Sequence, residues 1–224
     1  MNIPVYLEIG SKRTFASALD WPGWSRSEKD ETLAMDALLN YALRYAAVAR
    51  AVRVPFQAPA DVSVFVVTQR LDGDATTDFG TPGCIPPTDT QPMGEPELLR
   101  LQALLKGCWA IFDEVIEAAR GKTLRTGPRG GGRDRQKLID HVLGGEQAYL
   151  SRLGVKLQLP ESAPWSERMQ ECRQAVQEGL AASARGELPS HGPRGGLYWP
   201  ARYFARRSAW HILDHSWEIQ DRLT

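Results

Sequence analysis

Three of the four histidines in this chain have positions that could bind a metal ion. His211 and His215 form an HxxxH pair within AWHILDHSW, and residues four apart lie on one face of a helix. His141, in LIDHVLGGEQAYL, has apolar neighbours at helical spacing, which indicates that its side of a helix faces the core. A set of three imidazoles leaves coordination positions open, as in catalytic metal sites.

Histidine pairs at this spacing also arise by chance, with no metal bound. Depth along the helices favours the metal interpretation. His141 lies eight residues after Arg133 and His211 eleven after Pro200, so both lie roughly 12–16 Å into their helices. The sequence therefore predicts one divalent transition-metal ion. Imidazole ligands suit zinc or nickel best, and iron or manganese is compatible.

Two carboxylates accompany the HxxxH pair. Glu218 follows His215 by three residues, and Asp214 lies between the two histidines. Either could orient an imidazole, enter the ligand sphere or act as a general base, so both are candidate catalytic residues. The alternative for Asp214 is a structural contact, because it aligns with a stripe formed by Trp210 and Trp217.

A tyrosine on the first histidine helix is a candidate substrate-binding residue. Tyr149 follows His141 by eight residues and therefore shares its face of the helix. It could point toward a bound substrate. Packing in the core is the alternative.

Four long helical patterns must position these residues. They begin close to a proline or a charged cluster, and no strand pattern separates them. An α-helical domain at 96–224, an antiparallel four-helix bundle with up-down-up-down topology, is therefore expected. The four segments are 96–119, 133–153, 164–184 and 200–223.

The N-terminal third has a different pattern, and the predicted fold class is therefore α+β. Short strand patterns and one amphipathic helix predict a small β-β-(β)-α-β domain at 1–71. A stretch rich in Gly, Pro, Thr and Asp at 72–95 has no periodicity and is typical of a linker. The expected strands are 3–9, 13–18, 25–27 and 62–68, and the helix is 30–52.

The pentapeptide GPRGG occurs twice, at 127–131 and 192–196, before the second and fourth helices. In an up-down-up-down bundle both copies would lie at one end. Arg129 and Arg194 could then bind an anionic small molecule on its way to the ion. His191 could act as a proton shuttle or a fourth ligand. The alternative is that both copies are ordinary exposed loops.

The C-terminal half resembles the DinB/YfiT-like superfamily of metal-binding four-helix bundles. The resemblance covers about residues 95–224 and is most specific in RRSAWHILDHSWEIQDRL, which carries the HxxxH pair. It implies one ion held by His141, His211 and His215. Members of the superfamily include thiol-dependent transferases and a mycothiol-dependent isomerase, so a low-molecular-weight thiol is implied as a second cofactor.

The N-terminal segment ASALDWPGWSRSEKDETLAMDALLNY resembles the HicB-type antitoxin fold over about residues 1–70. No DNA-binding segment follows it. The alternative is a small α/β unit that packs on the helices or pairs with another chain.

Composition narrows the class of protein further. Lys plus Arg and Asp plus Glu both total 27, which argues against a nucleic-acid partner. No signal peptide or long apolar run is present, so we expect a cytoplasmic protein without membrane contact. The three cysteines, Cys84, Cys108 and Cys172, form no CxxC pair and are expected to be reduced.

These observations favour a metal-dependent enzyme acting on a small, anionic molecule by thiol-dependent transfer or by hydrolysis. Two alternatives stay open. The ion could only stabilise a non-catalytic binding protein, or the N-terminal unit could bind a partner as antitoxins do. A homodimer, through a helix face or a strand edge, is compatible with the sequence.

Overall fold

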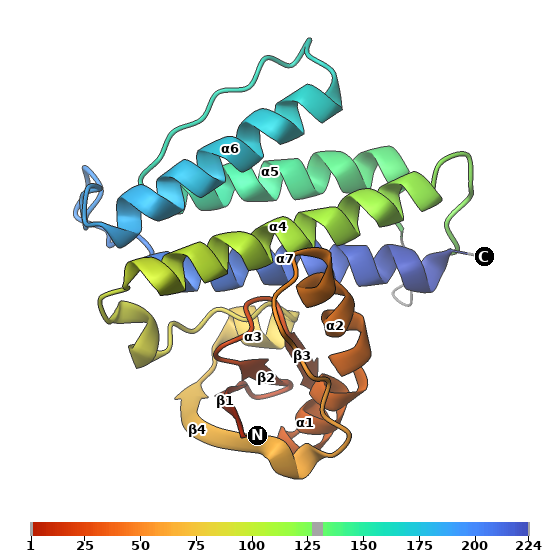
Figure 1. Ribbon diagram of the computed structural model, residues 1–224, viewed down its shortest axis with the longest axis vertical. Coiled ribbons are helices and arrows are strands. Elements are labelled where there is room, and N and C mark those ends of the chain that lie inside the picture. Colours follow the sequence, from red (N-terminus) through yellow and green to blue (C-terminus); the bar gives the residue numbers. More distant parts are fainter. Residues whose placement is uncertain (1, 127–131, 224) are drawn as a thin grey trace.

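The computed structural model describes residues 2–126 and 132–223. A four-stranded mixed sheet lies in the N-terminal part and is followed by the long helices of the C-terminal part (Figure 1). The predicted α+β class is therefore confirmed. None of the helices in the described ranges combines the length and the apolar character needed to cross a bilayer.

The sheet has the strand order β3-β2-β1-β4. Strand β1 pairs antiparallel with β2 and parallel with β4, and β2 pairs antiparallel with β3. A parallel pair needs a crossover connection, which the helices between β3 and β4 supply. The strands are β1 (Ile3–Ile9), β2 (Thr14–Ala18), β3 (Ser25–Glu28) and β4 (Phe65–Asp72).

The expected helix at 30–52 is divided into α1 (Glu31–Asn40) and α2 (Ala42–Ala51). At the division, the Tyr41 backbone N–H donates to the Leu38 carbonyl over 3.2 Å. This bond reaches back three residues, as in a 3-10 turn, where an α-helical bond reaches back four. The Trp24 indole donates to the same carbonyl over 2.8 Å. Tertiary contact thus interrupts a helix that the periodicity predicts as continuous.

The connecting segment 72–95 is ordered by contacts with buried charges. It contains helix α3 (Ala75–Phe79) and the short 3-10 helix η2 (Pro87–Thr90). The buried Glu8 carboxylate accepts hydrogen bonds from the backbone N–H groups of Gly83 (2.9 Å) and Cys84 (3.0 Å). A composition typical of a linker therefore contains fixed structure here.

A buried ion pair joins this segment to the last helix. Arg206 donates to both carboxylate oxygens of Asp89 over 2.7 and 3.0 Å, and the Asp89 side chain is 0% exposed. Arg206 also donates to the carbonyls of Ala18 and Leu19, at 3.1 and 2.8 Å. One guanidinium thus ties the sheet, the connection and the helix together.

Four long helices form the C-terminal part, and their bounds lie within two residues of the predicted ones. Asp134 caps the second by accepting from the Lys137 N–H (2.9 Å), and Gly154 ends it in the left-handed conformation (φ 97°). The helices are α4 (Glu95–Ala118), α5 (Arg135–Leu153), α6 (Trp165–Ala184) and α7 (Ala201–Arg222).

The predicted up-down-up-down order of these helices is wrong, because α5 and α6 run in the same direction (Figure 1). Arg135 lies 5.8 Å from the Trp165 ring centroid where both helices begin, and Gly179 lies against Leu150 near their ends. Residues 154–164 make the return. Eleven residues can span roughly 36 Å, which exceeds the roughly 30 Å length of a 20-residue helix.

The N-terminal unit packs on α4 and α7. The Phe15 ring meets Trp210 edge-on at 6.2 Å between centroids, and Tyr41 meets Trp217 at 4.9 Å. A Cβ on Gly107 of α4 would lie 2.6 Å from the Val48 carbonyl oxygen, so α2 and α4 touch at their backbones.

We expect Asp89→Asn to lower the free energy of unfolding by about 3 kcal/mol, because it leaves the buried Arg206 guanidinium without its counter-charge. Chemical denaturation measures the change. The control is Glu117→Gln, which removes the exposed Glu117–Arg120 pair and should cost less than about 1 kcal/mol. Equal effects of the two variants would show that the Asp89 pair does not anchor the connection.

Candidate metal centre

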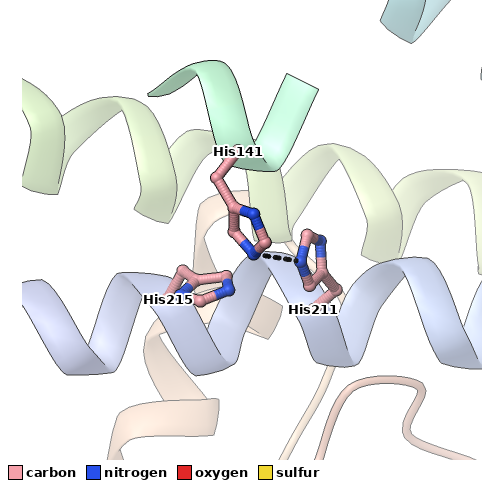
Figure 2. A group of neighbouring side chains, drawn as sticks. All are labelled: His141, His211 and His215. Atoms are coloured by element: carbon pink, nitrogen blue, oxygen red, sulfur yellow. Dashed lines mark hydrogen bonds between the residues drawn. The ribbon is translucent and has the colours of Figure 1, made fainter. Parts of the chain in front are cut away.

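Three histidines from two antiparallel helices converge in the C-terminal part (Figure 2). His211 and His215 lie one turn apart on α7, and His141 faces them from α5. The ring centroids are 4.7–5.0 Å apart, and the Nε2 atoms of His141 and His211 are 3.2 Å apart. One nitrogen from each ring lies within 4.8 Å of the others, as a single ion requires.

Burial keeps two of these imidazoles in the form that binds metal. It lowers the pKa of His141 to about 4 and the pKa of His211 well below its usual value, and the proximity of His215 adds to both shifts. The buried Nδ1 of His211 has no hydrogen-bond partner among the described residues. Neutral imidazoles with unused nitrogens at these distances fit a divalent transition-metal ion.

Glu218 lies where it can orient His215. Its Oε2 is 2.9 Å from the Nδ1 of His215, and its Oε1 accepts from Arg222 Nη1 over 2.7 Å. These contacts, with the His215 hydrogen bond foremost, lower the pKa of Glu218. A proton held on Nδ1 would leave Nε2 of His215 free as the ligand nitrogen.

Arg222 fixes this carboxylate to the backbone. Its guanidinium donates to the carbonyls of Arg125 (2.7 Å) and Arg133 (3.0 Å) as well as to Glu218. The Arg222 side chain is only 6% exposed. Arg222 therefore holds the Glu218 carboxylate beside His215, and the carbonyls of Arg125 and Arg133 hold Arg222.

Asp214 lies apart from this centre. Its carboxylate accepts from Arg26 Nη1 over 3.0 Å, on the side of α7 that packs on the N-terminal unit. Asp221 on the same stripe pairs with Arg44. These positions support the structural alternative for Asp214.

Of the two loops predicted to form one entrance, only the second lies within the described residues. The first, with Arg129, lies outside the described residues, but the adjacent Arg125 N–H donates to the carbonyl of Arg222 at the end of α7. The second, with Arg194, lies immediately before α7 begins. The expectation that the second and fourth helices begin at one end is wrong, because α5 and α7 are antiparallel, whereas the role expected of Arg129 stays a prediction.

His191 belongs to the second loop and is exposed. Its Nδ1 contacts Ser190 Oγ at 2.9 Å, and its backbone pairs with Leu197. The loop is joined to the end of α5 by a Trp199 N–H bond to the Arg152 carbonyl (2.8 Å). His141 lies eleven residues before Arg152, roughly 16 Å along the helix, so the structure does not bring His191 to the other histidines.

Tyr149 borders the centre, as its spacing predicts. Its ring meets the His211 ring edge-on, with 5.4 Å between centroids. The side chain is half-buried, and burial raises the pKa of its hydroxyl. Tyr149 therefore forms a wall next to His211.

Gly145 is a residue of this centre that sequence reasoning missed. A Cβ at this position would lie 2.3 Å from His211 Cε1, so only glycine lets the imidazole occupy its place. The adjacent Gly144 has open space beside it. A Gly-Gly pair inside a predicted helix is unfavourable by about 1 kcal/mol per residue. Such a pair indicates that another group lies close to the helix backbone at this point.

Glu146 is a second buried acid that the sequence did not single out. It is 0% exposed, accepts from the Trp109 indole over 2.7 Å, and has no partner for Oε2 among the described residues. Burial raises its pKa to about 7. Glu146 therefore carries a proton over part of the neutral range.

The cysteines are free, as expected, and none is poised as a nucleophile. Cys108 and Cys172 are buried, and burial raises the pKa of all three thiols, that of Cys84 to about 12. Thiolate is the reactive form of cysteine, and the raised pKa values disfavour it at all three positions.

A separate hollow of about 860 Å³ lies between the N-terminal unit and α4. Two of its charged side chains already have partners: Arg100 donates to the Asp20 carbonyl and lies over the Trp21 ring, and Glu97 pairs with Arg202. The histidine centre is therefore the stronger candidate for chemistry.

A comparison with known protein families, with curated proteins and with solved structures finds no match to this chain. The interpretation of the centre therefore depends on the positions and environments of its own residues.

We expect Gly145→Ala to weaken metal binding about 10- to 100-fold, because the new methyl group displaces His211. Zinc or cobalt titration measures the affinity. Gly144→Ala is the matched control: it should keep the affinity and raise helix stability by about 0.5–1 kcal/mol. Unchanged binding in Gly145→Ala would contradict a role for His211 as a ligand.

We expect Glu146→Gln to remove a pH dependence of stability. The folded-state pKa of Glu146 is raised above its unfolded value of about 4.5, so its stabilisation is present at low pH and is lost as pH rises through about 7. Between pH 5 and 8 the variant should gain roughly 2 kcal/mol relative to the wild type, measured by thermal unfolding. Parallel pH profiles would show that Glu146 is ionised throughout.

Proposed function

We propose that the chain is a metal-dependent enzyme whose C-terminal helices form a DinB-like four-helix bundle around one divalent ion. The observation that carries the proposal is the convergence of three imidazoles, two of them held neutral by burial, beside a carboxylate that orients the third. When bound, the ion would act as a Lewis acid that lowers the pKa of a water or a thiol to near neutral.

The residues of the chain have separate roles in this proposal. His141, His211 and His215 hold the ion. Glu218 keeps a proton on Nδ1 of His215, and Arg222 keeps Glu218 in place. Three protein ligands leave at least one position for a small-molecule substrate or for a low-molecular-weight thiol. The reaction class is thiol-dependent transfer, or hydrolysis where water is the nucleophile.

The N-terminal unit has a supporting role in this proposal. Its strands and helices cover α7 on the side opposite His141, through pairs such as Phe15–Trp210 and Arg26–Asp214. An appendage that packs on the helices accounts for these contacts without a separate partner protein.

Elemental analysis of protein purified without a histidine tag tests the proposal. We expect about one equivalent of a transition metal in the wild type and loss of most of it in His211→Ala. His191→Ala is the matched control, because it removes the exposed histidine at the far end of α5 and should keep the ion. A metal-replete preparation with no bound ion would contradict the proposal.

A further inference from the structure

Arg207 lies one turn before His211 on α7, four residues away and on the same face of the helix. Its guanidinium lies 5.1 Å from the Tyr149 ring centroid and 4.5 Å from that of Trp210. Both rings also neighbour His211, at 5.4 and 6.4 Å between centroids. Arg207 and His211, a candidate metal ligand, therefore share two aromatic neighbours.

The half-buried Arg207 contacts the Tyr149 side chain and the Trp210 ring but lacks the carboxylate partner that the buried Arg206 and Arg222 of α7 have. Arg206 pairs with Asp89, and Arg222 pairs with Glu218. In the part of the chain that the structure describes, Arg207 forms no ion pair, and its buried Nη1 has no hydrogen-bond partner. A buried charged donor without an acceptor is unfavourable, so this position favours an anion from outside the chain.

We propose that Arg207 binds the carboxylate of a small-molecule ligand whose other end lies at the three-histidine centre. A planar guanidinium edge matches a planar carboxylate, and the Tyr149 and Trp210 rings flank this guanidinium. This inference rests on the proposed function and gives its substrate class as a carboxylate-bearing small molecule. Anion recognition is thus assigned to a residue of α7 rather than to Arg129 or Arg194.

Cobalt-loaded full-length protein allows a direct test with two matched probes. 3-Mercaptopropionate and 3-mercaptopropanol both offer a thiolate to the ion, and only the first carries a carboxylate. The thiolate-to-cobalt absorption band reports binding without any assay of activity. We expect the carboxylate probe to bind the wild type about tenfold more tightly, a difference typical of one charge-assisted hydrogen bond.

Two variants and a control assign this preference to Arg207. Arg207→Met should abolish it while leaving the affinity for 3-mercaptopropanol unchanged, and Arg207→Lys should reduce it because the ammonium lacks the planar fork. Arg194→Gln, an exposed arginine of the second GPRGG loop, should keep the wild-type preference.

Equal affinities of the two probes for the wild type would overturn the inference and leave the proposed metal site intact. A preference that persists in both Arg207 variants would also overturn it. Failure of the wild type to bind cobalt would instead remove the proposed function, and the inference with it.

Discussion

Burial of α7 on two sides is the constraint on which the remaining structure depends. One side presents His211 and His215 to α5, and the other presents Trp210, Asp214 and Trp217 to the N-terminal unit. Contact on the second side is close: a Cβ on Gly23, whose φ is +88°, would lie 3.0 Å from Ala209. A helix held from both sides has little freedom to rotate, so the directions of its imidazoles are fixed.

A helix this rich in arginine can be buried only if its charges find partners, and those partners organise the segments around it. Arg202 forms an ion pair with Glu97 and donates to backbone carbonyls of the connecting segment, and Arg206 forms an ion pair with Asp89. Arg222 holds Glu218 and two backbone carbonyls. The order of segment 72–95 and the position of His215 therefore both follow from the need of the α7 arginines for partners. Arg207 is the departure from it, and it lies beside the histidines.

Local sequence predicted the elements well, because the helix bounds follow from apolar periodicity and from caps such as Asp134 and Gly154. It also indicated His141, His211 and His215 as one set, from the i, i+4 spacing of two of them and the apolar neighbours of the third. The expectation of equal depth was wrong, because it required α5 and α7 to begin at the same end and they are antiparallel. The directions of α5 and α6 depend on where residues 154–164 run, and periodicity contains no information on that path. Only the length of this segment indicated that it could return along a whole helix.

Contacts between distant residues account for the other differences. Gly145 matters because His211 lies against it, although 66 positions separate them in the chain. Segment 72–95 is ordered by Glu8 and Arg206, which come from outside it. In the same way, the expectation that α5 and α7 begin at one end failed, because the path between helices is set by contacts between distant residues.

X-ray absorption spectroscopy of the zinc-loaded chain tests the central claim most directly, because it counts the imidazoles bound to the ion. Three imidazole nitrogens at about 2.0–2.1 Å and at least one further light-atom ligand are the predicted first shell. A shell with fewer than two imidazoles would contradict the account, because the convergence of His141, His211 and His215 would then have no part in holding the ion.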